Sequence, residues 1–432
     1  MASITITAPT DRPIGVVTLP RSKSVAARAA IISNMAKPSG PRLAEEEFEA
    51  ELTNYPDAED SVILRRLLQG NPEVMDCGMG GTTLRFLLAW AAIRAGEEHL
   101  LTGAPRLIER PHQQLVDALR SMGADITVRP DGYLVRGKAL EGGSVHFDHA
   151  VSSQYISAVM MIGPMLPDGL RVHWTGPRLS EPYVSMTMTI MAHYEGWCSM
   201  KPAKEEPIVI ESGGYKLAPF EVPTDWSAAA FLYQLVALRP RTRIALSDLT
   251  IHGMQSDEAI AHLLNDVVET EEWEEVTMPE IRGFTIVHRN LRKLTKDNKP
   301  IDLTWFPDVF PSMAITHAAL GRTTTFTGLN NLYFKESDRV AAVREALAQL
   351  GIACEVDGGT VTVRSSPAQV EALRDRSFTF SPSNDHRMAM SLASLSLVCK
   401  SITINDPEVV NKSYPAFWNE LGKLGFKLLR EG

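Results

Sequence analysis

Apolar and polar positions along the chain follow two different periods, and the changes of period mark a recurring unit. Over residues 115–136 a helix-period run ends at Met122-Gly123, an alternating run follows, Asp131-Gly132 gives a turn, and a second alternating run returns. Glycine after a helix end and Asp-Gly between alternating runs are the signals of a helix cap and of a hairpin. The pattern predicts a helix followed by two hairpin-connected strands.

The same unit recurs in the second half of the chain. It is found at residues 343–364, with Leu350-Gly351 and Asp357-Gly358 at the same joints, and in truncated form at 418–430, with Leu424-Gly425. Units of this type are common and can recur by chance, which is the alternative interpretation. Repetition in both halves favours a duplicated architecture of the α/β (α+β) class.

Three further segments suggest where the chain divides. Residues 38–60 are acidic and turn-rich and are predicted to form an exposed loop, and the acidic run 269–280 is predicted to be a solvated face. Two prolines in 219–224 precede a predicted Ala-rich helix at 227–238, which indicates that the chain passes from one domain to the other there. Residues 19–23 would be the other point at which it passes between the domains. We expect one domain of residues 1–21 plus 225–432 and a second of residues 22–224, and these bounds are a prediction from the sequence alone.

Composition narrows the class of protein. A chain of 432 residues with 44% hydrophobic content can bury a large core in two or more domains. The net charge of −9 argues against nucleic acid or an acidic membrane surface as the main partner. The four cysteines are scattered, which favours reduced thiols over disulfides or zinc, and we see neither a signal peptide nor an apolar run of membrane-spanning length. We therefore expect a soluble, cytoplasmic protein.

Several predicted helices begin with polar or basic groups. A strand-like run at 14–19 leads through Pro20 into Ser22-Lys23-Ser24 and a helix at 25–35 that carries Arg28. Free N–H groups at a capped helix start attract anions, so this stretch predicts an anion site, although an ordinary capped helix explains it equally well. Similar starts follow along the chain, at Gly81-Thr82 with Arg85, at Glu109-Arg110-Pro111, at Ser152-Ser153-Gln154 and at Ser180-Glu181-Pro182-Tyr183.

The second half of the chain is richer in ionisable groups. Asp308 precedes a long apolar helix, where the helix dipole favours a charged carboxylate. Residues 335–339 form a mixed-charge cluster that on its own is more typical of a surface salt-bridge network. The cluster at 384–387 leads into an Ala/Met/Leu-rich helix whose flank should be buried, so it is harder to explain as surface.

Together, and in this order, these motifs resemble the enolpyruvyl transferases, and within them the branch that acts on shikimate 3-phosphate. The resemblance covers residues 19–417 and rests on Ser22-Lys23-Ser24 with Arg28, Gly81-Thr82 with Arg85, Glu109-Arg110-Pro111, Ser152-Ser153-Gln154, Lys335-Glu336 with Asp338-Arg339, and Asp385-His386-Arg387-Met388. It implies two similar domains, each of three βαβαββ units with inner helices and outer sheets (an inside-out barrel). It also implies an active site in an interdomain cleft that closes on substrate.

The resemblance further implies which residues meet each substrate. Shikimate 3-phosphate is expected at Lys23, Ser24, Arg28, Ser152, Ser153, Gln154, Ser180, Tyr183, Asp308, Asn331 and Lys335. Phosphoenolpyruvate is expected at Lys23, Gly81, Arg110, Gln154, Arg339, Arg387 and Lys412. Several cations suit a small molecule with both a phosphate and a carboxylate, because guanidinium groups bind such anions bidentately. No metal or organic cofactor is required, and we expect a monomer.

The implied reaction transfers an enolpyruvyl group and releases phosphate, which needs a base at the attacking hydroxyl and an acid at the methylene carbon. Asp308 is the expected base, and Glu336 and Lys23 both stay open as the acid. Three positions depart from the family pattern: Arg21 in place of a glycine, Met79 in place of an asparagine, and Glu181 in place of a non-acidic residue.

Two alternative functions fit the sequence less well. The sister branch that acts on UDP-N-acetylglucosamine uses a loop cysteine as its acid, and residues 94–123 contain no cysteine. A non-catalytic protein that binds small anions would keep the basic residues and lose the acid and base, whereas Asp308 and Glu336 are both present.

Overall fold

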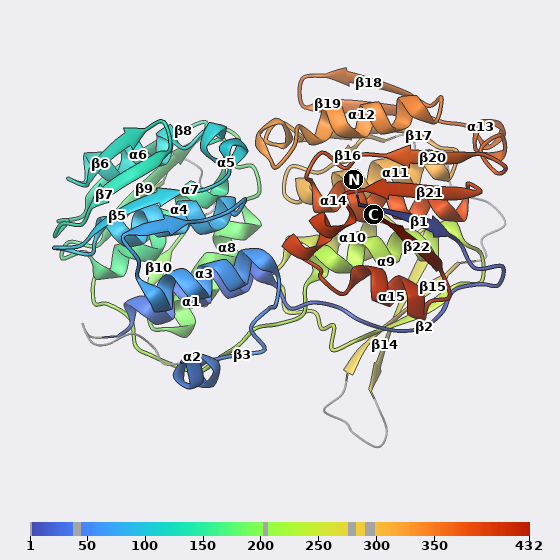
Figure 1. Cartoon of the computed structure of the whole chain (residues 1–432). Helices are drawn as coiled ribbons and strands as arrows, with labels where there is room; N and C mark the ends of the chain where they lie inside the picture. Colours follow the sequence, from blue (N-terminus) through green and yellow to red (C-terminus); the bar gives the residue numbers. More distant parts are fainter. Residues whose placement is uncertain (1, 38–44, 202–205, 275–281, 290–298) are drawn as a thin grey trace. The chain divides into compact units, whose positions relative to one another are not determined.

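The chain divides into two compact units. The computed structural model describes residues 2–37, 45–201, 206–274, 282–289 and 299–432. Unit 1 consists of Met1–Pro20 with Thr224–Gly432, and unit 2 of Arg21–Pro223 (Figure 1). Each unit has its own hydrophobic core.

The two larger sheets of unit 2 share one topology. In the first, the outer strand β4 pairs in parallel with β5, and β5, β7 and β6 then pair antiparallel. In the second, β8 pairs in parallel with β9, and β9, β11 and β10 pair antiparallel. These strands are β4 (Val74–Asp76), β5 (Glu98–Thr102), β6 (Asp125–Arg129), β7 (Gly132–Arg136), β8 (Gly143–Asp148), β9 (Leu170–Thr175), β10 (Cys198–Ser199) and β11 (Ile208–Ile210).

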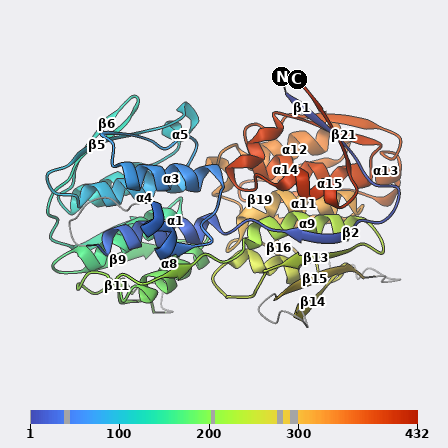
Figure 2. The ribbon, with the colours of Figure 1, turned by 60° about the horizontal axis from the view of Figure 1, so that its bottom comes forward.

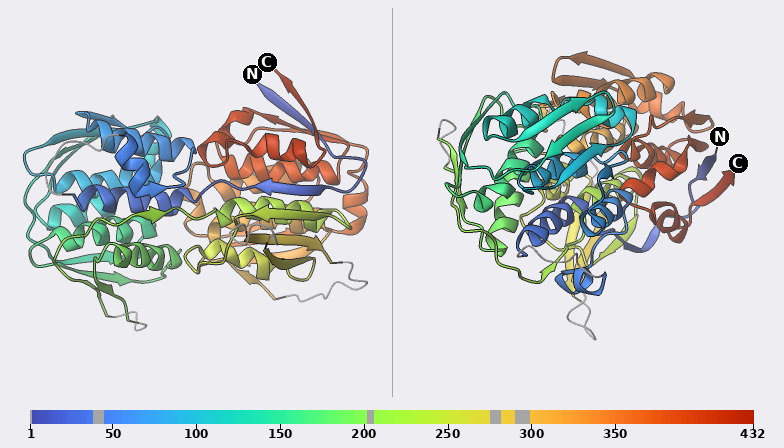
Figure 3. Two further views of the ribbon diagram at one scale, coloured as in Figure 1. Left: turned by 90° about the horizontal axis from the view of Figure 1, so that it is seen from below. Right: turned by 60° about the vertical axis from the view of Figure 1, so that its left-hand side comes forward.

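Unit 1 repeats this topology in three sheets, with strand orders β2-β13-β15-β14, β16-β17-β19-β18 and β20-β21-β1-β22. The first pair of each sheet is parallel and the remaining pairs are antiparallel. The strands are β1 (Ser3–Thr7), β2 (Ile14–Thr18), β13 (Arg243–Ser247), β14 (Val268–Glu274), β15 (Arg282–His288), β16 (Ile301–Asp302), β17 (Thr323–Thr327), β18 (Ala353–Asp357), β19 (Thr360–Arg364), β20 (Ser377–Phe380), β21 (Ser401–Asn405) and β22 (Lys427–Glu431). The first and last strands of the chain, β1 and β22, lie side by side (Figure 3).

A sixth, smaller sheet completes the repeat in unit 2. Within the described residues it holds only a parallel pair, β3 (Leu52–Thr53) with β12 (Phe220–Glu221). Six sheets that each begin with a parallel pair confirm the expected α/β fold of two similar domains built from repeated units.

Apolar helices form the centre of each unit. In unit 2, α1 (Lys23–Met35), α4 (Gly81–Ala92), α7 (Ser153–Ile162) and α8 (Pro182–His193) contact one another. In unit 1, α9 (Trp226–Leu238), α11 (Phe310–Ala319) and α14 (His386–Ala393) do the same, and Figure 2 shows them between sheets. Every residue of α9 is buried, as expected of a helix that is apolar on all sides.

The remaining helices lie around these central ones. In unit 2 they are α2 (Glu45–Glu51), α3 (Glu59–Gly70), α5 (Pro105–Glu109), α6 (Gln113–Ser121) and the 3₁₀ turn η1 (Gly163–Met165). In unit 1 they are η2 (Ser256–Ala259), α10 (Ile260–Leu263), η3 (Pro307–Val309), η4 (Leu332–Phe334), α12 (Arg339–Gln349), α13 (Pro367–Glu371), η5 (Ser394–Leu397), η6 (Pro407–Lys412) and α15 (Phe417–Lys423).

The three repeats predicted from the sequence are confirmed as secondary structure. They are α6-β6-β7, α12-β18-β19 and, in truncated form, α15-β22. Gly123, Gly351 and Gly425 follow their helices at φ of 97°, 72° and 88°, in the left-handed region that glycine adopts without strain.

The predicted exposed loop at 38–60 is wrong for its described part. Residues 38–44 lie outside the described residues, but α2 and β3 follow, and α3 begins at Glu59. Phe48 and Leu52 are four residues apart and both buried, and Phe48 packs edge-on against Tyr55. Acidic side chains dominate the composition of this segment, but burial of the apolar Phe48 and Leu52 determines its structure. In the run 269–280, Glu269 and Glu271 are exposed on β14 and residues 275–280 lie outside the described residues.

Two findings concern all described residues. No helix among them is both long enough and apolar enough to cross a membrane. No group of three or more His, Cys, Asp or Glu side chains among them is arranged to hold a metal ion. The four cysteines are free thiols.

Candidate active site

Serines cap the starts of α1 and α7, and α1 begins at Lys23, two residues before its predicted start. The Val25 N–H donates to Ser22 Oγ at the start of α1, and the Gln154 N–H donates to Ser152 Oγ at the start of α7. Ser and Thr are favoured there because the hydroxyl accepts from an N–H group that the helix leaves unpaired. The caps place Lys23 on the first turn of α1 and Gln154 on that of α7.

Lys23 forms an ion pair within unit 2. Its Nζ lies 2.9 Å from Asp60 Oδ2, and both side chains are less than one-fifth exposed. Asp60 stands on the first turn of α3, where a negative charge is favourable, and its carbonyl accepts a hydrogen bond from Thr83 Oγ1 on α4. The pair therefore links the first turns of α1, α3 and α4.

A second cluster gathers at the start of α4. Arg85 Nη1 donates to Gln154 Oε1 at 2.6 Å, and Gln154 Nε2 donates to Thr82 Oγ1 at 3.0 Å. A Cβ atom at Gly81 would lie 2.5 Å from Arg110 Nη1, so the guanidinium occupies the space beside this glycine. The structure thus brings Gly81, Arg110 and Gln154 into one cluster, as the sequence motifs suggested.

Arg28 is buried inside unit 2 and is 1% exposed. Its guanidinium donates to the Thr187 and Ser157 hydroxyls and to the Ser24 and Tyr183 carbonyls, and it lies over the Phe86 and Tyr183 rings. Burial lowers its pKa to about 10. These contacts tie Ser24 and Tyr183 together, and direct contact of Arg28 with a substrate stays a prediction.

The segment around Ser180 precedes α8. Ser180 is buried and has a φ of 57°, a left-handed conformation that is uncommon for serine and occurs often at functional sites. Glu181 accepts from the buried Arg178 at 3.0 Å. The unusual negative charge at position 181 is therefore neutralised locally. On α7, Ser153 is buried one residue after its cap.

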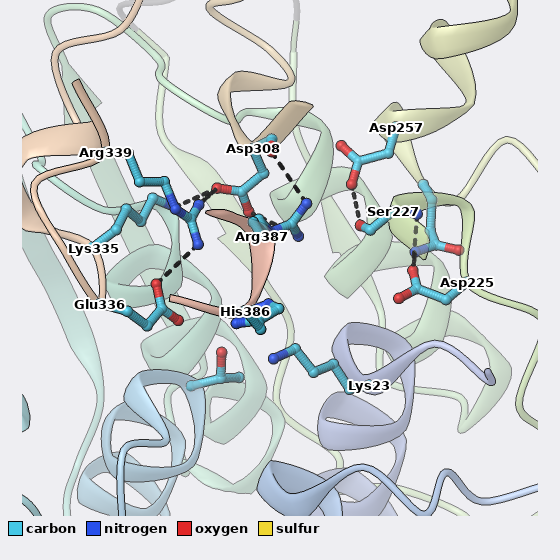
Figure 4. Close-up of polar contacts among 12 residues, drawn as sticks. Lys23, Asp225, Ser227, Asp257, Asp308, Lys335, Glu336, Arg339, His386 and Arg387 are labelled. Carbon is cyan, nitrogen blue, oxygen red and sulfur yellow. Dashed lines mark hydrogen bonds and ion pairs between the residues drawn. The ribbon is translucent and has the colours of Figure 1, made fainter. Parts of the chain in front are cut away.

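In unit 1 the Asp308 carboxylate is surrounded by cations (Figure 4). Its Oδ1 lies 3.0 Å from Lys335 Nζ and 2.7 Å from Arg339 Nη1, and its Oδ2 lies 3.5 Å from Arg387 Nη2. Arg387 also donates to the Asp308 carbonyl at 3.2 Å. Asp308 stands on η3, immediately before α11, as the sequence indicated.

Glu336 and Asp385 extend this network from two other elements. Glu336 pairs with Arg339 at 3.0 Å and lies 3.9 Å from Lys412 Nζ. Asp385 accepts from Arg339 Nε at 2.8 Å and caps α14 through the Arg387 N–H at 2.9 Å. The structure therefore brings the predicted unit 1 residues into one network, with Asn331 buried just before η4.

The surroundings set the protonation of this network. Burial alone would raise the pKa of Asp308, but Lys335, Arg387 and Arg339 outweigh it and hold this pKa well below its ordinary value. Burial lowers the pKa of Lys335 and Asp308 opposes that shift, whereas the three carboxylates around Arg339 raise its pKa despite burial. The result is an ionised carboxylate bound to several cations.

Sequence reasoning missed several residues of these clusters. Asp60 was assigned to an exposed loop, although Glu59-Asp60 before an amphipathic run is a first-turn acidic signal. Arg85 was noted only as part of a motif, because nothing in its local sequence reveals that it donates to Gln154.

The chain matches the EPSP synthase (3-phosphoshikimate 1-carboxyvinyltransferase) family over residues 44–421. A 3-phosphoshikimate 1-carboxyvinyltransferase of Bacteroides fragilis strain YCH46 is 34% identical over 423 residues, covering 95% of each chain. One of Methanoculleus marisnigri is 32% identical over 355 residues, covering 80% of this chain and 78% of the relative. The solved structure of EPSP synthase from Acinetobacter baumannii superposes with a TM-score of 0.74 at 21% identity over 100% of both chains, which shows the same fold. The chain belongs to the EPSP synthase family.

Proposed function

We propose that this chain transfers the enolpyruvyl group of phosphoenolpyruvate to the 5-hydroxyl of shikimate 3-phosphate and releases phosphate. Family membership supports this reaction, and so does one observation at the candidate active site. The carboxylate of Asp308 lies among Lys335, Arg339 and Arg387, with Glu336 on the same arginine. These two carboxylates can exchange protons with a substrate bound by the cations, which the proposed reaction requires.

The reaction needs two proton transfers in its addition step and a further one in its elimination step. The 5-hydroxyl attacks C2 of phosphoenolpyruvate and gives its proton to a base, while C3 gains a proton from an acid, which forms a tetrahedral intermediate. The bond from C2 to the phosphate oxygen then breaks, C3 loses a proton again, and phosphate leaves. We propose Asp308 as the base and Glu336 or Lys23 as the acid.

The cations around Asp308 control both its ionisation and its strength as a base. With its pKa held well below the ordinary value, Asp308 is ionised but only a weak base. We propose that the anionic groups of the two substrates compete for Lys335 and Arg387 and so weaken the pull of these cations on Asp308. Its pKa then rises toward the range in which it can accept a proton.

The remaining residues divide by substrate. For phosphoenolpyruvate we propose Lys23, Gly81, Arg110 and Gln154 of unit 2 with Arg339, Arg387 and Lys412 of unit 1. For shikimate 3-phosphate we propose Lys23, Ser24, Arg28, Ser152, Ser153, Gln154, Ser180 and Tyr183 of unit 2 with Asp308, Asn331 and Lys335 of unit 1. Several of these residues lie together in each unit: Gly81, Arg110 and Gln154 at the start of α4, and residues of both sets around Asp308.

We also propose that the chain acts as a cytoplasmic monomer. All the proposed residues come from one chain, and four free thiols suit a reducing compartment.

Phosphate release with both substrates, in the presence of EDTA, tests the proposal. We expect turnover only when shikimate 3-phosphate and phosphoenolpyruvate are both present, with a product whose mass equals the sum of the substrates minus phosphoric acid. UDP-N-acetylglucosamine in place of shikimate 3-phosphate should give no phosphate. Binding of both substrates without phosphate release would contradict the proposal.

A further inference from the structure

The turn that leads from β9 into α8 contains an ion pair that has no part in the mechanism above. Arg178 Nη1 lies 3.0 Å from Glu181 Oε1. The Arg178 side chain is only 3% exposed, and its guanidinium lies over the ring of Trp174 on β9, with 5.4 Å from Cζ to the ring centroid. The pair therefore joins the two ends of a four-residue turn and anchors them to a buried residue of β9.

Ser180 lies inside this turn and has an unusual backbone conformation. Its φ of 57° is in the left-handed region, which costs free energy for a residue with a β-carbon and persists where the surrounding structure imposes it. Ser180 is buried, and its carbonyl accepts from the Tyr183 N–H at 3.1 Å as α8 begins. Arg28 in turn donates to the Tyr183 carbonyl at 3.3 Å. The chain is thus held on both sides of Ser180, by the Arg178–Glu181 pair before α8 and by Arg28 within it.

Glu181 places a negative charge close to residues that we assign to the substrate phosphate. Ser180 and Tyr183 both belong to the shikimate 3-phosphate set, and a carboxylate repels a phosphate. The guanidinium of Arg178 balances this charge, and a pair with so little exposure is screened less by salt than a surface pair. The pair adds no net charge to the turn, so its contribution is a fixed geometry.

We propose that Arg178 and Glu181 are positioning residues whose ion pair holds Ser180 in the conformation in which its hydroxyl binds shikimate 3-phosphate. The inference rests on the proposed function, in which Ser180 binds that substrate. A hydroxyl that is already aligned binds without the entropy cost of ordering the turn. If Glu181 acted only through its charge, its removal would have the opposite effect, because the phosphate would then bind more tightly.

A double-mutant cycle tests the inference. Calorimetry without phosphoenolpyruvate gives the dissociation constant of shikimate 3-phosphate for the wild type, Glu181→Ala, Ser180→Ala and the combined variant. We expect Glu181→Ala to weaken binding about five- to tenfold, at the lower end of the cost of an uncommon backbone conformation, although it removes a negative charge. In the Ser180→Ala background the same substitution should change the constant less than about twofold, because the hydroxyl that the pair positions is absent.

Two control variants show whether the effect belongs to this contact. Glu181→Gln keeps an acceptor for the Arg178 N–H and should weaken binding less than Glu181→Ala does. Glu98→Ala breaks an exposed pair with Arg136 in the same unit and should leave the constant unchanged. The KM for phosphoenolpyruvate should change less than about twofold in all of these variants, because the pair acts on the other substrate.

A variant on the other side of the pair covers the case in which Glu181→Ala does not fold, as judged by its melting temperature. Arg178→Met then takes its place in the cycle, because methionine keeps the packing against Trp174. Its effect on binding should also disappear in the Ser180→Ala background. Simple repulsion of the phosphate by an unpaired Glu181 would persist there.

Each outcome decides the inference. Tighter or unchanged binding to Glu181→Ala, an unaffected Ser180→Ala, or a loss that persists in full in the combined variant would overturn it, while wild-type turnover leaves the proposed function intact. A wild type that does not bind shikimate 3-phosphate would overturn both.

Discussion

The guanidinium of Arg110 fills the space in which a side chain at Gly81 would have to lie. A Cβ atom added at Gly81 would come within 2.5 Å of Arg110 Nη1 and 3.0 Å of Cζ, closer than such atoms approach each other. Gly81 has an ordinary backbone conformation, so close packing against the arginine, and not chain geometry, is what requires glycine here.

We therefore expect Gly81→Ala to displace Arg110 and to weaken the binding of phosphoenolpyruvate specifically. The KM for phosphoenolpyruvate should rise by about tenfold, in line with partial loss of a charged hydrogen bond, while the KM for shikimate 3-phosphate changes less than about twofold. Gly70→Ala on α3 is the matched control, because its Cβ would meet only Pro72 at 3.7 Å. Equal changes in both KM values for Gly81→Ala would contradict the assignment of Arg110.

Asp308→Ala should separate catalysis from binding. Loss of a group that acts mainly in the transition state costs about 10²–10³ in turnover, by analogy with oxyanion-hole deletions. We expect at least that loss in kcat, with a far smaller change in the affinity for shikimate 3-phosphate measured by calorimetry. Glu336→Gln should lower turnover similarly if Glu336 handles the C3 proton, and it should slow deuterium exchange into the methylene group. Near-normal turnover of Asp308→Ala would show that another residue is the base.

Arg387→Ala should weaken phosphoenolpyruvate by about 1.5–3 kcal/mol, the range for a hydrogen bond to a charged group. Affinity for shikimate 3-phosphate, measured alone by calorimetry, should change little. Arg364→Ala, which breaks an exposed pair with Glu355, is a control that should leave both affinities unchanged. Equal losses for both substrates would mean that Arg387 supports the whole network and does not bind one ligand.

The free energy of unfolding should decrease as the pH falls, and His112 should account for part of this decrease. This residue is 1% exposed, its Nε2–H donates to the Leu107 carbonyl, and burial followed by the charge of Arg85 lowers its pKa to about 3. In the unfolded chain it binds a proton below its ordinary value of 6.5, so the stability that neutral His112 contributes is present above pH 6.5 and is lost as the pH falls toward 3.

This loss amounts to about 1.4 kcal/mol of unfolding free energy per pH unit within that window. Urea unfolding at pH 7.5, 6.5 and 5.5 should therefore show a steeper decline for the wild type than for His112→Gln, which keeps an N–H donor. His317→Gln should flatten the decline in the same way, because burial also lowers the pKa of His317 to about 3. Parallel pH profiles for wild type and both variants would contradict this account.

Local signals in the sequence predicted the elements that depend on local physics. A serine cap at the first helix, the glycine ends of the repeats and the Asp-Gly hairpin turns were visible, because caps and turns depend on residues within a few positions of one another. The exact cap was not, because Ser22 and Ser24 are both suitable and the helix begins two residues before its predicted start. The same signals placed Asp308 before its helix and Arg387 at the start of another.

Pairings between distant residues could not be predicted in this way. Asp60 contacts Lys23, which is 37 positions away, and Asp257 contacts Ser227, which is 30 positions away. The local sequence around each acidic residue does not indicate its partner. The helix at α2 was missed for a related reason. Its acidic composition is typical of a loop, and burial of Phe48 depends on contacts that only the folded unit provides.

Because β1 pairs with β21 and β22, its sheet can form only after these two strands have been synthesised. Unit 2 is one uninterrupted stretch, so all of its strands have been made once residue 223 has been added. Strand β1 is made first but finds its partners only at residues 401–405 and 427–431. At about 5–20 residues per second, the first strand is exposed to the ribosome and to chaperones for roughly ten to forty seconds after unit 2 is complete. Its sheet closes only when residues 427–431 have been added, so a nonsense codon between β21 and β22 would leave β1 without one of its two neighbours.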